Sequence, residues 1–196
     1  MLKVSNFFNK RGIVSLIKIG KKNQIFKGRF IKLWGTEFFD KDGNPQLWEW
    51  IEKAQAILVF PVTRHREVVL IKNFRVPLEK YVIEIPAGLR DKPGESPLEV
   101  AQRELLEESG YEGTNFVEVP VWPYRAGSSN GIIQAFIATD VRKVKDNITG
   151  DTMEDITVME VPLDGLLDLY FDLQEDILFQ PEILALYQMA QHLKLV

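Results

Sequence analysis

The sequence contains no cysteine among its 196 residues. This absence excludes disulfide bonds, zinc–thiolate sites and cysteine nucleophiles, and it leaves the compartment unmarked by redox chemistry. No apolar run approaches the ~18 residues that a membrane span requires, and no continuous apolar segment near the N-terminus is typical of a secretory signal. We therefore expect a cytoplasmic protein that has no membrane partner.

Histidine is scarce, and neither cation nor anion dominates the composition. His65 and His192 have no neighbours at metal-ligand spacing, so we assign them no role. The formal net charge of −4 argues against a general nucleic-acid-binding face. The length suits one catalytic domain with a small extension.

Residues 96–110 predict a helix with clear ends. Ser96 suits the N-cap, Pro97 suits the first helical position, and Glu99 completes a capping box. Gly110 is a natural end, because the residue after a helix often needs positive φ. Three apolar residues share a side and should face a core: Leu98, Ala101 and Leu105.

The same helix carries an acidic face. Glu104, Glu107 and Glu108 have i, i+3, i+4 spacing, so their like charges destabilise the helix unless they have a partner. Arg103 offers local relief. A solvated acidic face would explain the glutamates alone, whereas Mg²⁺ binding would use them as oxygen ligands. The spacing of the whole surrounding string favours the metal site.

That string, residues 88–111, resembles the Nudix box G-x5-E-x7-R-E-U-x-E-E-x-G-U, in which U is a bulky apolar residue. From Glu95 onward the match is complete. Between Gly88 and Glu95 the chain has six residues instead of five, which leaves the position of Glu95 open. Loops absorb insertions more readily than helices. The resemblance implies hydrolysis of a nucleoside diphosphate linked to another group.

The resemblance also implies a metal site for Mg²⁺, with Mn²⁺ as an alternative. Glu104 and Glu108 would be the main ligands, assisted by Glu107 and by the backbone carbonyl of Ala87. Arg103 would orient the carboxylates. The residues assigned to catalysis are Glu154, Glu107 and Arg103, and Glu154 is also a metal-ligand candidate.

Further segments resemble the ADP-ribose and nucleotide-sugar pyrophosphatase branch of the family. Residues 83–88 are similar to its E-L-P-A-G segment, and residues 73–77 to its Q-Y-R-x-P segment. The second likeness implies that Arg75 binds substrate phosphates, for which a guanidinium fork is suited. Residues 151–156 resemble its acidic E-x-E-x-I loop. There Thr152 stands where some relatives place the catalytic base, so that role falls to Glu154, to Asp151 or to a glutamate of the box, or the base is unusual.

Other substrate contacts are expected from the N-terminal region and from a loop near residue 127. Glu52 follows a segment similar to one that precedes the core in the branch. Trp48 and Trp50 share a strand face and could stack a nucleobase, although packing or a dimer interface explains aromatic residues equally well. Ser129 or Arg125 would contact substrate.

The remaining pattern alternates strands with helices. We expect strands at residues 24–34, 46–52, 56–62, 68–74, 81–85, 116–122, 131–139 and 156–161, and helices at 164–169 and 181–195. Asp42-Gly43 is a turn signal. The resemblance implies an α/β fold, the Nudix α/β/α sandwich with a mixed sheet, at residues 55–196. It also implies a small antiparallel β-domain at residues 1–54 for dimerisation and substrate contacts.

Together these features predict Mg²⁺-dependent hydrolysis of ADP-ribose or a related nucleoside diphosphate sugar. The products would be a nucleoside monophosphate and a sugar phosphate, and the enzyme would be a homodimer without a nucleic-acid partner. Two alternatives remain. One is hydrolysis of a dinucleoside polyphosphate or an RNA 5′ end, and the other is a Nudix-fold sensor that binds a ligand without turnover.

Overall fold

The computed structural model describes residues 17–146 and 155–196. Three residues named above, Asp151, Thr152 and Glu154, therefore lie outside the described residues. The chain divides into two compact units. One comprises Met1–Glu52 together with Arg125–Asn130, and the other comprises Lys53–Tyr124 together with Gly131–Val196.

The first unit contains a three-stranded antiparallel sheet of β1 (Lys18–Lys27), β2 (Lys32–Phe39) and β3 (Pro45–Ile51). The expected single strand at residues 24–34 is wrong. A turn closed by the hydrogen bond from Gly28 N to Ile31 O, at 2.8 Å, divides that stretch between β1 and β2. The turn predicted at Asp42-Gly43 is confirmed, and Gly43 has the positive φ of 86° that favours glycine.

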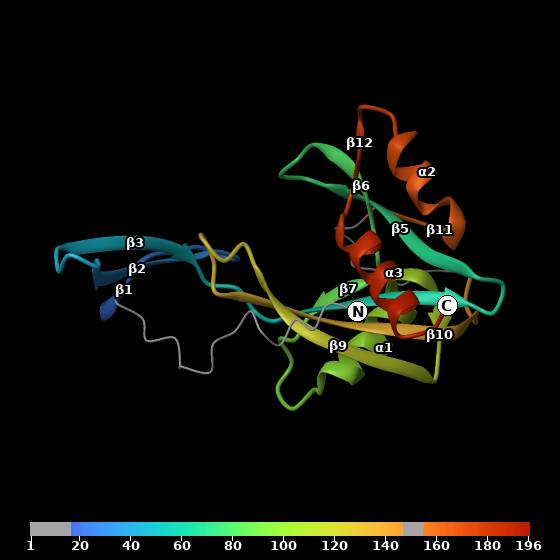
Figure 1. The fold of residues 1–196 in the computed structure, drawn as a ribbon, viewed down its shortest axis with the longest axis horizontal. Coiled ribbons are helices and arrows are strands. Elements are labelled where there is room, and N and C mark those ends of the chain that lie inside the picture. The colour runs from blue at the N-terminus through green and yellow to red at the C-terminus, as the bar shows by residue number, and fades with distance from the viewer. Residues whose placement is uncertain (1–16, 147–154) are drawn as a thin grey trace. The chain divides into compact units, whose positions relative to one another are not determined.

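The second unit is built on a nine-stranded sheet (Figure 1). Its strands are β4 (Ala56–Thr63), β5 (Glu67–Arg75), β6 (Lys80–Glu84), β7 (Ala87–Leu89), β8 (Tyr111–Glu112), β9 (Asn115–Tyr124), β10 (Gly131–Lys143), β11 (Ile156–Pro162) and β12 (Ile177–Phe179). Its α-helices are α1 (Pro97–Ser109), α2 (Leu166–Phe171) and α3 (Glu182–His192), and a 3₁₀ helix spans Leu163–Gly165. The sheet is mixed, because β4 pairs with β10 in parallel while β4 and β5 are antiparallel.

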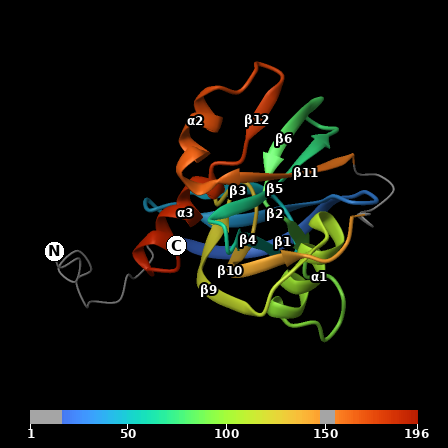
Figure 2. The same ribbon diagram turned by 90° about the vertical axis from the view of Figure 1, so that its right-hand side faces the viewer.

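Two cores lie on opposite faces of this sheet. Along β4, Ile57 and Val59 belong to the core that includes residues of α1. Leu58 and Phe60, which point the other way, belong to the core that includes residues of α2 and α3. Figure 2 shows α1 on one side of the sheet, with α2 and α3 on the other. The expected α/β/α sandwich with a mixed sheet and an additional antiparallel sheet is confirmed.

The ends of α1 form as predicted. The Ser96 side chain accepts a hydrogen bond from Glu99 N, the Glu99 side chain accepts one from Ser96 N, and Gly110 has φ 75°. Two of the predicted core contacts, Ala101 and Leu105, are fully buried. The third is wrong: Leu98 is exposed, because it lies in the first turn and the buried stretch of the helix begins two residues later, at Val100.

Candidate active site beside the acidic helix

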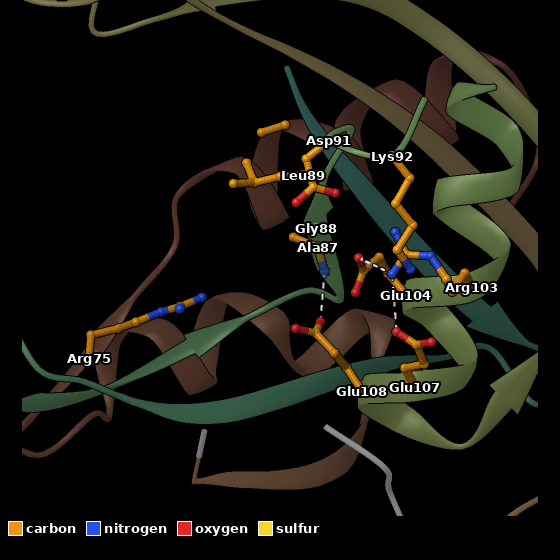
Figure 3. Close-up of a pocket in the computed structure, with 11 residues that line it drawn as sticks. Arg75, Ala87, Gly88, Leu89, Asp91, Lys92, Arg103, Glu104, Glu107 and Glu108 are labelled. Carbon is orange, nitrogen blue, oxygen red and sulfur yellow. Dashed lines mark hydrogen bonds and ion pairs between the residues drawn. The ribbon is translucent and has the colours of Figure 1, made fainter. Parts of the chain in front are cut away.

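A pocket of about 590 Å³ lies where α1 faces β7 and the loop that joins them. Figure 3 shows the side chains of its lining, which come from both elements, from the loop between them, from the start of β4 and from the end of β5. The lining residues are Ala56, Arg75, Ala87, Gly88, Leu89, Asp91, Lys92, Arg103, Glu104, Glu107 and Glu108. The pocket therefore gathers the acidic residues of the helix with the Ala-Gly strand and Arg75.

Arg103 connects three carboxylates at this site. Its Nε lies 2.9 Å from Glu95 Oε1, and its Nη1 lies 2.6 Å from Glu104 Oε1 and 3.1 Å from Glu107 Oε2. The hydrogen bond to Glu95 is the main reason that the pKa of Arg103 is raised. The same bond lowers the pKa of the Glu95 carboxyl. The six-residue spacing after Gly88 thus leaves Glu95 in contact with Arg103, and the loop absorbs the additional residue.

Glu108 fastens the helix to the strand beside it. Its side chain is buried, and Oε2 accepts a hydrogen bond from Ala87 N at 2.8 Å, drawn in Figure 3. The next residue, Gly88, is equally constrained. A Cβ on Gly88 would lie 1.8 Å from Glu104 Oε1, so the carboxylate occupies space that only glycine leaves open. The strand and the helix therefore pack so closely at Gly88 that a methyl group would not fit between them.

Arg75 enters the pocket already paired. Its Nη2 lies 2.6 Å from Glu84 Oε2, and its Nε donates to both oxygens of the same carboxylate. Glu84 belongs to β6 and is itself largely shielded from solvent. This forked contact with Glu84 fixes the orientation of the Arg75 guanidinium at the pocket.

The donor set fits a hard divalent cation that shares its ligands with substrate. Glu104, Glu107 and Glu108 offer carboxylate oxygens to one pocket, and Gly88 leaves room for the first of them. In the described part of the chain, no cluster of three or more acidic or histidine side chains forms a ready metal cage. Mg²⁺ commonly uses one or two carboxylates and completes its shell with water and phosphates, so such a cage is not required.

The other candidate substrate residues belong to the first unit. Trp50 stacks on Trp34 with a centroid distance of 6.0 Å and donates through Nε1 to Thr36. Trp48 donates through Nε1 to Gly127 O at 2.9 Å. These contacts give both tryptophans packing roles, and part of each also lines a cavity of about 320 Å³ within this unit.

Glu52 and the loop of residues 125–130 are likewise held within the first unit. Glu52 pairs with Lys32 and accepts a hydrogen bond from Trp34 Nε1 at 2.8 Å, and the Lys32 hydrogen bond lowers the pKa of Glu52. Ser129 forms an isolated bridge with Ile51 and lines the 320 Å³ cavity. Arg125 begins the loop with φ 49°.

Sequence reasoning missed several residues of the site. Asp91 and Lys92 line the pocket, yet no motif position marked them. The Lys-Pro-Gly turn signal that begins at Lys92 was available in the sequence and could have drawn attention to this loop. The pairing of Glu84 with Arg75 joins residues of two different motif segments, and only the register of β5 against β6 places these residues together.

The geometry agrees with comparisons against known proteins. The family model described as NUDIX domain matches residues 52–179, which is more than half of the chain. The chain belongs to the Nudix family. No helix in residues 17–146 or 155–196 has the length and apolarity needed to cross a bilayer.

This Nudix chain has curated relatives over most of its length. It is 33% identical to an ADP-ribose pyrophosphatase of Bacillus subtilis, an alignment that covers 76% of this chain and 80% of the relative. It is 34% identical to a methanol dehydrogenase activator of Bacillus methanolicus, covering 75% and 79%. A crystal structure titled as an ADP compounds hydrolase superposes with a TM-score of 0.75, covering 90% of this chain and 93% of the other at 20% identity. That last similarity concerns the fold.

Proposed function

We propose that this Nudix chain hydrolyses the diphosphate bond of ADP-ribose or a related nucleoside diphosphate sugar in a Mg²⁺-dependent reaction. A nucleoside monophosphate and a sugar phosphate would be the products. The observation that carries the proposal is the single pocket that joins the acidic face of α1, the Ala87–Gly88 strand and the pre-oriented Arg75. The relative named ADP-ribose pyrophosphatase, 33% identical over most of both chains, supports the substrate class.

The protein groups have separable tasks in this reaction. Glu104, Glu107, Glu108 and the Ala87 carbonyl would hold the cation. When bound, the cation supplies charge neutralisation at the diphosphate and a more acidic water. Arg103 keeps Glu104 and Glu107 in place through its hydrogen bonds. Arg75 would bind a phosphate oxygen, and its pairing with Glu84 fixes the orientation of the guanidinium.

Water must lose a proton as it attacks phosphorus. Glu107 is the best-placed candidate base among the described residues, because its side chain is the most exposed of the three helix glutamates that line the pocket, at 42%. Its hydrogen bond to Arg103 orients the carboxylate. Glu154 remains a second candidate for base or ligand on the strength of the sequence resemblance alone.

The N-terminal unit would supply dimerisation and contacts to the nucleoside. Supporting this assignment, the 10 residues of β1 are exposed and the β3 residue Trp48 is 51% exposed. A second copy of the chain would cover the exposed apolar side chains of β1, Ile19, Ile25 and Phe26. The substrate would meet Trp48, Trp50, Glu52, Arg125 and Ser129. Light scattering coupled to gel filtration should give twice the monomer mass of 22.6 kDa at micromolar concentration. A monomer mass there would contradict the assignment.

The activity is tested by phosphate release in a phosphatase-coupled assay with Mg²⁺. The substrate panel is ADP-ribose, GDP-mannose, UDP-glucose and a dinucleoside polyphosphate. The control variant is Glu108→Gln, whose amide oxygen can still accept the Ala87 hydrogen bond and so preserves the helix–strand contact. Turnover of a diphosphate sugar that is lost in Glu108→Gln supports the proposal. Binding of these ligands without any turnover would instead identify a sensor.

A further inference from the structure

Lys92 stands out among the charged residues of the pocket. Two other cations line it, but Arg75 is committed to Glu84 and Arg103 to Glu95, Glu104 and Glu107. Lys92 forms no ion pair with a carboxylate within residues 17–146 and 155–196. Figure 3 shows its side chain extending from the loop toward Arg103 and Glu104. The pocket therefore contains one cation whose charge is left for something that enters.

The loop that carries Lys92 is pinned at both ends. Arg90 N donates to Gln55 O at 2.9 Å, and Arg90 Nε donates to Glu95 O at 2.8 Å. Glu95 in turn is bound by Arg103. These contacts tie the loop to the edge of the sheet and to the helix, so its backbone has little freedom to lose when a ligand binds.

Lys92 itself occupies the first position of a tight turn. Glu95 N bonds to Lys92 O at 3.4 Å, with Pro93 and Gly94 between them. Proline fixes φ at the second position of such a turn, and Gly94 supplies the positive φ, 83°, required at the third. The turn lies in the stretch that is one residue longer than the usual Nudix box. This chain's own loop therefore determines where the ammonium group stands.

The electrostatic balance of the pocket indicates what Lys92 would meet. Four carboxylates line the pocket, those of Asp91, Glu104, Glu107 and Glu108, and a diphosphate adds further negative charge. Lys92 also acts on Glu95, which lies outside this lining: after the Arg103 hydrogen bond, the charge of Lys92 is one of the influences that lower the pKa of Glu95. An exposed ammonium pairs readily with phosphate oxygens as a point charge.

We propose that Lys92 is a substrate-binding residue whose ammonium group donates a hydrogen bond to a phosphate oxygen of the diphosphate. It thereby lowers KM without taking part in the chemical step. The inference rests on the proposed function for the identity of the substrate. The alternative is that Lys92 is a solvated surface lysine that contributes only to solubility. The two explanations differ in whether the ammonium charge at this position matters to ligand binding.

The test compares wild-type protein with Lys92→Gln, Lys92→Arg and Lys145→Gln. Lys145 is exposed and lies outside the pocket lining. Its substitution by glutamine removes the same net charge as Lys92→Gln, so Lys145→Gln is the matched control. For ADP-ribose with Mg²⁺, Lys92→Gln should raise KM roughly five- to tenfold, the size of one charge-assisted hydrogen bond, and leave kcat within about twofold. Lys92→Arg should restore KM, and Lys145→Gln should match wild type. The dependence of kcat/KM on salt should weaken only in Lys92→Gln.

The outcomes separate this inference from the proposed function. An unchanged KM in Lys92→Gln, or an equal rise in Lys145→Gln, would overturn the role of Lys92 while the hydrolase stands. If wild-type protein turns over none of the substrates, the same variants are compared by calorimetric titration with ADP-ribose. A weaker Kd confined to Lys92→Gln then supports Lys92 as a ligand residue, and equal Kd values or no binding at all refute it.

Discussion

Glu108 Oε2 lies 2.8 Å from Ala87 N, so the last turn of the acidic helix is tied to the strand that begins the pocket. The bond uses one oxygen of a carboxylate that is buried. This bond couples the position of the helix to that of the strand, so a substitution in either should also displace the other.

Gly88→Ala should abolish most activity while the protein stays folded. The new methyl carbon would lie 1.8 Å from Glu104 Oε1, and the carboxylate must swing away because it is the flexible partner. A misplacement of about 1 Å can cost 100-fold in rate. Steady-state kinetics and thermal unfolding would measure the two effects. Gly165→Ala is the control, since a Cβ there meets nothing within 4 Å. Near-normal activity in Gly88→Ala would contradict the close fit.

Arg75→Lys should raise KM about tenfold, because an ammonium lacks the planar fork of donors that pairs with Glu84 and suits a phosphate group. Glu84→Gln should have an effect in the same direction, since the amide holds the guanidinium less firmly. Arg66→Lys, at an exposed and loosely paired arginine, serves as control. Kinetics with ADP-ribose provide the measurement. Equal KM values for all variants would remove Arg75 from the substrate site.

The Glu95–Arg103 pair predicts an acid limit to stability. The pKa of Glu95 is lowered in the folded protein, below its usual 4.5, chiefly by the Arg103 hydrogen bond. The stabilisation is therefore fully present above pH 4.5 and is lost as the pH falls through the lower, folded-state pKa. Thermal unfolding against pH should show wild type losing stability there. Glu95→Gln should show a flatter profile, and identical acid slopes would contradict this account.

Tyr111→Phe should lower the free energy of unfolding by about 1–2 kcal/mol. The Tyr111 hydroxyl donates to Glu160 of β11, burial raises the pKa of the phenol, and removing the hydroxyl leaves the Glu160 oxygen without this donor. Urea unfolding would measure the loss. Tyr170→Phe, at a partly exposed ring, is the matched control and should be neutral. A similar loss in both variants would point to a general effect of the substitution.

Local sequence signals predicted the helix of the site almost completely. Ser96, Glu99 and Gly110 act within a few residues of one another, so the capping chemistry that they encode needs no tertiary information. The same is true of the spacing of the acidic residues. The Nudix resemblance then supplied the sandwich, which the strand pattern alone did not identify.

Contacts between distant segments could not be predicted in this way. The pairing of Arg75 with Glu84 depends on the register of two strands, and the exposure of Leu98 depends on where burial of the helix begins, at Val100. The strand expected at residues 24–34 failed because its apolar pattern continues through the turn that begins at Gly28. Hydrophobic alternation reports burial, whereas turns depend on backbone bonds that it does not encode.

The pinned loop between Arg90 and Glu95 has a consequence for how such an enzyme diversifies. Its two anchors hold the loop at Glu95, which stays in contact with Arg103 although the loop has an additional residue. Residues 91–94 can thus change in length or charge without retuning the hydrolytic machinery. Substrate preference can then change by substitution while the catalytic residues stay the same. A library of variants confined to those four positions would therefore be an efficient search for new substrates.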